Sequence, residues 1–399
     1  MKILHVSDEH VRDRDIDEIA ICLNFIVETA RAEQPDLIVS AGDLFDSQDV
    51  KMGSKSAIAA VGFISALADI APVAIIIGTP IHDGKAPEVL RFARGTFPIH
   101  VATIPEQVYL YEGAFRDGDM QDGRPQAVLT MIPQPTKQFF QTTAGVEDSD
   151  KEIGQAMTGL FAGFGASAAE HLSVPHVLVT HLNVNGCRLA NGQCKTGMDI
   201  EVSVDQMNMG NFDLGCLGHI HKSQTLGEKY FYSGPIYSTK IDEVGPMGFW
   251  VHGINVTETE IGESHRFIET PCKRTVRLQC DLTTEIFSSL RIVDFLPENP
   301  DGRDVRIELT VWQDEAAEIN KEEIKSLGMA AGALSVDIRI NAVPREAIRA
   351  AAVLEAQTLR DEIREMSILR GESIDPEIMV MAEKLENVPG EELLKEVGA

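Results

Sequence analysis

Short apolar stretches that end in polar residues recur along the first part of the chain. Residues 2–8 (KILHVSD), 35–43 (PDLIVSAGD) and 72–78 (PVAIIIG) each hold a continuous apolar run of strand length. Between them, residues 15–33 and 54–69 carry apolar side chains at helical spacing. Alternating strands and helices predict right-handed crossovers in a largely parallel sheet, and continuous apolar runs are typical of strands covered on both faces. The pattern therefore predicts an α/β fold with a layered β-sheet core flanked by helices.

Further strands are predicted in the middle of the chain. Residues 174–181 (VPHVLVTH) and 212–221 (FDLGCLGHIH) are apolar runs that end in histidines. Glycine-punctuated β segments follow at 230–238 and 248–256. These segments extend the same domain to about residue 270.

The pattern changes around Pro271. Three strands and two helices are expected next, with strands at 274–282, 304–312 and 334–343 and helices at 284–294 and 320–328. A helical tail opens at Pro344, with one apolar stripe and a second short helix at 375–387. The stripe consists of Ile348, Ala352, Leu359, Ile363 and Met366. We predict three parts: a main domain at 1–270, a small α+β domain at 271–343 and a helical tail at 344–399.

Charge limits the partners that this fold can have. The net charge is −27, and the excess is spread out: residues 1–271 carry 19 basic and 36 acidic side chains, and residues 272–399 carry 16 and 26. Such a chain repels nucleic acid unless metal ions or a local basic patch reverse the field.

The six cysteines lack the close spacing of a metal site and are expected to be reduced. The start lacks a signal peptide and no apolar run reaches the ~20 residues of a membrane span. We therefore expect a cytoplasmic chain that does not associate with membranes.

Polar residues with metal-binding chemistry follow five of the predicted strands. In open parallel sheets, ligands sit beyond the carboxyl ends of the strands, so these residues are expected at one rim. They are Asp8 and His10, Asp43 and Asp46, His82 and Asp83, His181, and finally His219 and His221.

Each of these motifs is weak alone, because an Asp-x-His pair or a Gly-Asp step is usually part of a turn. Together they form a set of carboxylates and imidazoles without thiolates, which suits Mn²⁺, Fe or Zn²⁺ better than Ca²⁺ or Mg²⁺. A carboxylate shared by two ions would hold them about 3.5–4 Å apart, the spacing used for displacement at phosphorus. The alternative is that Asp and His end these strands by chance.

In this order, the motifs resemble those of the calcineurin-like metallophosphoesterases. The segments are SDEH (7–10), GDLFD (42–46), GTPIHD (78–83), VTH (179–181) and GHIH (218–221). The opening MKILHVSDEH, the later YSGPI segment, the small domain and the tail narrow the resemblance to the SbcD-type nuclease subunit of DNA break repair.

The resemblance implies a site for two divalent ions, with Mn²⁺ the expected metal. The first ion would be held by Asp8, His10, Asp43 and His221. Asp43 would bridge to the second ion, which His181 and His219 would also hold. His82 would be the catalytic histidine, and Asp83 and Asp46 would orient its imidazole. The activity implied is a 3′→5′ exonuclease and single-strand endonuclease.

One motif departs from the family pattern. The family has Gly-Asn-His-Asp, in which the asparagine binds the second metal, whereas this chain has Gly78, Thr79, Pro80 and Ile81 before His82. The Thr79 hydroxyl, a backbone carbonyl or a water could replace the missing amide. We predict that the second site binds metal more weakly and still works; the alternative is a chain without activity.

Substrate and partner contacts are less well marked. Arg188, Lys195 and Lys85 are candidate contacts to a phosphate backbone, although incidental charges on exposed loops explain them equally well. The small domain resembles one that helps to place DNA over the metals. The tail resembles a segment that docks on a coiled-coil SbcC-type ATPase, and packing against the chain's own body is the alternative. A homodimer is a further option.

Three functions remain open from sequence. The first is a DNA nuclease that works with the ATPase, which would supply part of the grip on DNA. The second is a phosphodiesterase for a small substrate such as a cyclic nucleotide, which an acidic surface tolerates better. The third is a catalytically weakened scaffold that bridges its partner and DNA.

Overall fold

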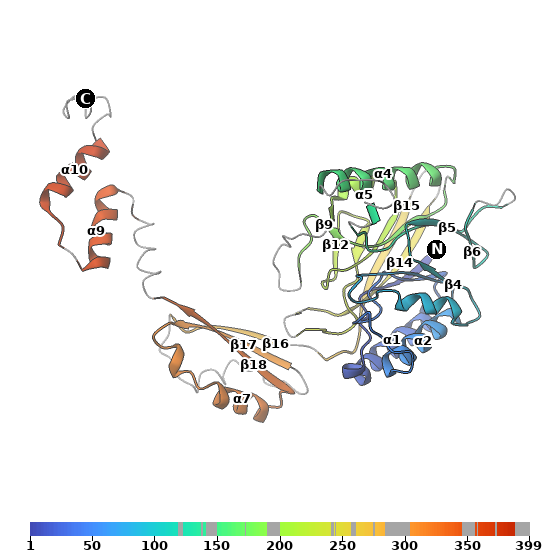
Figure 1. Ribbon diagram of the computed structural model, residues 1–399, viewed down its shortest axis with the longest axis horizontal. Helices are drawn as coiled ribbons and strands as arrows, with labels where there is room; N and C mark the ends of the chain where they lie inside the picture. Colours follow the sequence, from blue (N-terminus) through green and yellow to red (C-terminus); the bar gives the residue numbers. More distant parts are fainter. Residues whose placement is uncertain are drawn as a thin grey trace. The chain divides into compact units, whose positions relative to one another are not determined.

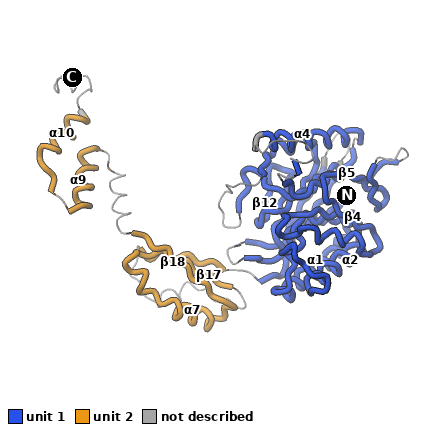
Figure 2. Tube along the Cα trace, viewed as in Figure 1, with its two compact units in different colours: residues 1–275 blue, residues 276–399 orange. Residues whose placement is uncertain are grey.

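The computed structural model divides into two compact units, residues 1–275 and 276–399 (Figure 2). It describes residues 1–118, 123–136, 139–140, 150–171, 173–189, 200–240, 243, 245–256, 261–273, 276–283, 304–344, 356, 358–371 and 373–387.

The first unit is built on two β-sheets. The six-stranded sheet has the order β15-β14-β1-β2-β3-β4, and the seven-stranded sheet has the order β12-β13-β11-β8-β7-β5-β6. The strands of the first sheet are β1 (Lys2–Val6), β2 (Leu37–Ser40), β3 (Val73–Ile76), β4 (Ile99–Ala102), β14 (Gly248–Val256) and β15 (Ile261–Glu269). Those of the second are β5 (Glu106–Tyr111), β6 (Ala114–Arg116), β7 (Ala127–Ile132), β8 (His176–His181), β11 (Leu214–Gly218), β12 (Gln224–Leu226) and β13 (Tyr230–Tyr232). A small parallel pair joins β9 (Asn183–Val184) to β10 (Glu201–Val202).

The predicted parallel core is confirmed, with one change. Strands β1 to β4 run parallel, as do β7, β8 and β11 in the other sheet. The histidine-tipped strands β8 and β11 therefore lie in a second sheet, and the expectation that all five strand ends share the rim of one sheet is wrong. Both sheets contain the same kind of buried parallel strand, and only non-local pairing decides which sheet a strand joins.

Helices cover the outer faces of the two sheets (Figure 1). The helices of the first unit are α1 (Ile16–Glu33), α2 (Lys55–Ala68), α4 (Asp150–Ala168) and α5 (Val204–Asn208), with 3₁₀ turns η1 (Asp13–Asp15) and η2 (Ala86–Phe92). Helices α1 and α2 match the predicted segments 15–33 and 54–69. Three apolar layers result: one between α1, α2 and the first sheet, one between the sheets, and one between the second sheet and α4.

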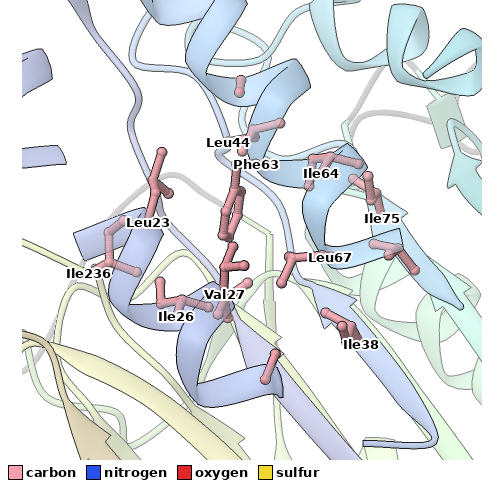
Figure 3. Packing of buried hydrophobic residues seen from close by; sticks show 14 of the residues in the cluster. Leu23, Ile26, Val27, Ile38, Leu44, Phe63, Ile64, Leu67, Ile75 and Ile236 are labelled. Atoms are coloured by element: carbon pink, nitrogen blue, oxygen red, sulfur yellow. The ribbon is translucent and has the colours of Figure 1, made fainter. Parts of the chain in front are cut away.

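The layer under α1 and α2 fixes the strand ends that carry the polar residues (Figure 3). Leu23, Ile26 and Val27 project from α1 at helical spacing and are buried. Phe63 and Leu67 of α2 complete the same cluster. Helix α2 starts at Ser54, whose hydroxyl accepts a hydrogen bond from the Ala57 amide at 3.2 Å, as helix N-caps commonly do.

Several elements of this unit were not predicted. Strands β4 to β7, β15 and helix α4 all fall in stretches that the sequence analysis left unassigned. Strands β4 to β7 have only three to six residues each, too few for a clear period.

The second unit contains a small sheet and a helical region. Strands β16 (Val276–Asp281), β17 (Asp304–Trp312) and β18 (Ser335–Val343) are all parallel, with 3₁₀ turn η3 (Ala316–Glu318) and helix α7 (Lys321–Ala330) between the last two. Helices α9 (Leu359–Arg370) and α10 (Pro376–Asn387) follow. The predicted helix at 284–294, together with Ile348 and Ala352 of the tail stripe, lies outside the described residues. Among the helices that are described, none combines the length and the apolarity that crossing a membrane requires.

Candidate metal centre

The loops after β1 and β2 form the floor of the site. They are joined by backbone hydrogen bonds from Asp8 N to Gly42 O (2.9 Å) and from His10 N to Asp43 O (3.0 Å). Neighbouring parallel strands therefore deliver their polar tips to one place. Asp8, His10 and Asp43 are almost completely buried there.

Backbone strain is concentrated at the predicted ligands. Asp8, His10, Asp43 and His219 have φ angles of 53°, 41°, 57° and 95°, a region that non-glycine residues seldom adopt. Such strain persists only where the surrounding structure enforces it, and it is common at functional sites.

Two glycines are required by the close approach of these loops. A Cβ atom on Gly78 would lie 2.2 Å from the backbone nitrogen of Asp43. One on Gly218 would lie 2.1 Å from the carbonyl oxygen of Ala41. Gly78 thus allows the loops after β2 and β3 to meet within one sheet, and Gly218 allows the end of β11 in the second sheet to meet the end of β2 in the first.

Asp8, His10 and His221 form the first cluster, in which ligand atoms lie within 4.8 Å of one another. The Nε2 atoms of His10 and His221 face each other at 2.9 Å, and His221 Nε2 is 3.8 Å from an Asp8 oxygen. Nδ1 of His10 is buried and has no hydrogen-bond partner. Two imidazole nitrogens that converge beside a buried carboxylate are the pattern expected of a cation site.

Glu243 orients one of these imidazoles and was missed by the sequence analysis. Its carboxylate accepts a hydrogen bond from His221 Nδ1 at 2.5 Å and others from the Thr239 amide (2.7 Å) and the Lys240 amide (3.1 Å). Burial opposes ionisation of both groups, but their contact raises the pKa of His221 and lowers that of Glu243. Because Nδ1 donates its proton to Glu243, Nε2 presents its lone pair to the site, as in carboxylate–histidine–metal arrangements. Acidic residues are frequent in this chain, and no spacing signal marks this one.

Asp8, Asp43 and His181 form the second cluster. Nδ1 of His181 donates to the carbonyl of Ala41 at 2.7 Å, which directs Nε2 to Asp43 Oδ2 at 3.3 Å. The same Asp43 oxygen is 3.9 Å from His10 Nε2, so Asp43 lies between the two clusters, where a bridging carboxylate is needed. Burial opposes charge on His181, but Asp43 outweighs it and raises the pKa of His181 to about 9. A cation would replace that proton.

Thr79, one of the candidate replacements for the absent asparagine, lies beside Asp43 and His181. Its hydroxyl donates to Asp43 Oδ2 at 3.0 Å and lies 3.3 Å from His181 Nε2. Its carbonyl accepts from the amides of His82 and Asp83, both at 2.9 Å. Of the three replacements considered from sequence, the hydroxyl is therefore the protein atom that faces two predicted ligands.

His82 lies beside the first cluster. Its ring is edge-on to His10, with centroids 4.7 Å apart, and its Nδ1 donates to the backbone carbonyl of Asp46 at 2.9 Å. We expected the carboxylate of Asp46 to orient His82, but the backbone of Asp46 does so. The Asp46 carboxylate instead lies 3.6 Å from His10 Nδ1 and 3.3 Å from Arg12.

Asp83 was expected to orient His82. In the structure its carboxylate braces the loops after β2 and β3. Its two oxygens accept hydrogen bonds from the amides of Gly78 (2.8 Å), Asp43 (2.9 Å) and Phe45 (3.0 Å). The role as a brace follows from a fully buried carboxylate whose contacts are backbone donors. Burial, reinforced by Asp43, raises the pKa of Asp83 to about 7.

The remaining candidates differ in their surroundings. His219 contacts the site through its backbone amide, which donates to Asp8 at 3.0 Å, and its ring packs edge-on to His181 at 5.2 Å. Lys85 lines a pocket of about 340 Å³ together with Gly78 and Pro80, next to Thr79. Arg188 is exposed, and Lys195 lies outside the described residues.

These residues fit a pair of divalent ions. Two clusters of buried oxygen and nitrogen donors share Asp8 and are joined by Asp43. Without cations, several buried carboxylates would stand close together, an arrangement that is costly unless charge compensates it.

A comparison with protein families agrees with this interpretation. A family model described as calcineurin-like phosphoesterase matches residues 1–78, the segment that contains Asp8, His10 and Asp43. Two solved structures are similar to the chain at 11% identity: GAP50, the anchor in the inner membrane complex of Plasmodium (TM-score 0.43, covering 68% of this chain and 85% of that one), and a dimetal phosphatase from Danio rerio (TM-score 0.42, covering 68% and 99%). The family match and the two donor clusters support a metal-dependent phosphoester hydrolase.

Proposed function

We propose that the chain is a two-metal phosphodiesterase that cleaves DNA, with 3′→5′ exonuclease and single-strand endonuclease activity, and that Mn²⁺ is its metal. The observation that carries the proposal is the pair of donor clusters sharing Asp8 and joined by Asp43. Bound ions in such a site neutralise charge on the phosphate and activate water.

The residues of the chain have distinct tasks in this reaction. Glu243 and the Ala41 carbonyl fix the tautomers of His221 and His181, so that both present Nε2 inward. Asp83 holds the Asp43 loop against Gly78. The His82 ring is anchored at Nδ1, which leaves Nε2 available to donate to the scissile phosphate or its leaving oxygen.

DNA is the proposed substrate because the motif order, the small second unit and the helical tail together resemble SbcD-type nucleases. Lys85, which lines a pocket with Gly78 and Pro80, offers a cation for a neighbouring phosphate. A phosphodiesterase for a small substrate is the second candidate, and the net charge of −27 favours it.

An SbcC-type coiled-coil ATPase is the proposed partner. Helix α10 exposes Ile378, Val380, Met381 and Leu385, each at least half accessible. Apolar helix faces of this kind commonly dock into grooves of partner proteins, and a partner that holds DNA would offset the acidity of this chain.

The activity is tested by supplying Mn²⁺ with labelled single-stranded DNA and, separately, with a small chromogenic phosphodiester. Cleavage of DNA supports the proposal. Cleavage of the small ester alone favours the second candidate, and cleavage of neither at saturating Mn²⁺ leaves only a scaffold role.

The His82→Ala variant tests the role of that side chain. We expect activity to fall by about 100-fold or more, as for loss of a general acid, while the bound metal remains. His100→Ala is the control, because His100 pairs with Glu106 at 2.9 Å elsewhere on the first unit. Loss of metal along with activity would show that His82 is a ligand.

A further inference from the structure

A second group of metal-binding side chains lies in the apolar layer between the two sheets. His5, Cys216 and His252 are each fully buried, and their ligand atoms lie within 4.8 Å of one another. None of the three belongs to the donor clusters of the candidate metal centre.

The strand periodicity places these side chains together. His5 faces the same side of β1 as Ile3, and His252 the same side of β14 as Ile254, both toward the layer between the sheets. Cys216 enters that layer from β11 of the other sheet. The group therefore joins the two sheets.

A chain of hydrogen bonds sets the orientation of His252. Its Nδ1 lies 2.9 Å from Nδ1 of His265, the residue directly opposite on β15, and His265 Nε2 lies 3.2 Å from Glu263. When His265 donates to Glu263, it accepts the proton of His252 Nδ1. Nε2 of His252 then presents a lone pair to the interior, the second-shell arrangement seen at metal-bound histidines.

His5 completes the pattern. Its Nδ1 is 3.4 Å from His252 Nε2, which is long for a hydrogen bond. Two nitrogens on one tetrahedral Zn²⁺ lie about 3.3 Å apart, given Zn–N bonds of roughly 2.0–2.1 Å. The imidazole pair is thus already spaced for a shared cation.

We propose that His5, His252 and Cys216 form a buried Zn²⁺ site that ties the two sheets together, separate from the catalytic metals. A thiolate with imidazoles is the donor set that selects Zn²⁺ over harder ions. Binding forms the zinc–sulfur bond and releases the Cys216 proton to solvent. His265, whose side chain is 16% exposed, marks the way in from the surface.

The ionisation of the group agrees with this assignment. Burial lowers the pKa of His5 to about 3 and that of His252 well below its ordinary value, so both rings are neutral and free to ligate. Burial raises the pKa of the Cys216 thiol, so a cation is needed to keep the thiolate.

Cobalt distinguishes this site from the catalytic one. Co²⁺ bound by a thiolate gives a near-ultraviolet charge-transfer band, whereas the carboxylate–imidazole clusters lack sulfur. The metal-stripped full chain should develop this band on titration with Co²⁺, and Zn²⁺ should abolish it. Cys216→Ser should lose the band, and Cys22→Ser, which changes a buried thiol on α1, should keep it.

Two further variants distinguish loss of a metal site from loss of the fold. His181→Ala should lose catalytic metal and retain the cobalt band. The zinc proposal can therefore hold even if the nuclease proposal fails. His252→Asn should lose the band and retain Mn²⁺ binding. Absence of the band in the unaltered chain, or its persistence in Cys216→Ser, would overturn the proposal and leave the group as a stack of neutral imidazoles.

Discussion

Replacing Glu243 by glutamine tests whether a buried carboxylate prepares the metal centre. The substitution keeps the shape of the side chain and an oxygen that can accept from Thr239 and Lys240, but it removes the charge that faces His221 Nδ1 at 2.5 Å. Glutamine can also offer its amide to Nδ1, which would favour the wrong tautomer.

The expected loss follows from that contact. A hydrogen bond to a charged group contributes about 1.5–3 kcal/mol, which corresponds to about 10- to 150-fold in binding. Carboxylates behind metal-bound histidines typically contribute about 10- to 100-fold. We therefore expect one of the two Mn²⁺ affinities to weaken by about 10- to 100-fold, with the other nearly unchanged.

Calorimetric titration of Mn²⁺ into the metal-free chain measures this effect. Glu106→Gln is the matched control, because Glu106 also pairs with a histidine, His100, away from the site. Unchanged affinities in Glu243→Gln, or an equal loss in both variants, would refute the role assigned to Glu243.

Three further predictions concern other residues. Thr79→Val should weaken one Mn²⁺ affinity, because valine lacks the hydroxyl that faces Asp43 and His181. Thr79→Asn should keep that affinity, because its side-chain amide offers an oxygen in place of the hydroxyl. Equal Mn²⁺ binding by the unaltered chain and both variants in calorimetry would contradict this. Asp83→Ala should lower the free energy of unfolding in urea by about 3–5 kcal/mol, because three buried backbone amides lose their acceptor; a loss below about 1 kcal/mol would exclude the bracing role. Burial lowers the pKa of His176 from 6.5 to about 4. Below about pH 6.5, unfolding therefore takes up a proton, and the free energy of unfolding decreases as the pH is lowered. Unfolding free energies should show His176 contributing a loss of about 2 kcal/mol between roughly pH 7 and 5, a difference that His176→Gln should not show.

The sequence was informative where residues with metal-binding side chains directly follow an apolar run of strand length. Asp8, His10 and Asp43 directly follow apolar runs, so their place at strand ends could be predicted before any fold was known. The same local pattern could not tell that β8 and β11 belong to another sheet, because pairing partners lie far away in the chain.

The contacts that the sequence did not reveal depend on long-range folding. Glu243 contacts His221 from a loop, and Asp83 accepts hydrogen bonds from backbone amides in the loops after β2 and β3. His5 and His252 are 247 residues apart and become neighbours only when β14 pairs with β1.

The candidate metal ligands come from both sheets, and this bears on the order of events during synthesis on the ribosome. Asp8, His10 and Asp43 emerge first, but His181, His221 and Glu243 follow only after most of the first unit has been translated. If these residues bind metal as proposed, a nascent chain has Asp8, His10 and Asp43 without the later imidazoles, and it would gain high affinity for metal only once the second sheet folds. The proposed cleavage activity would then be withheld from truncated products of interrupted translation.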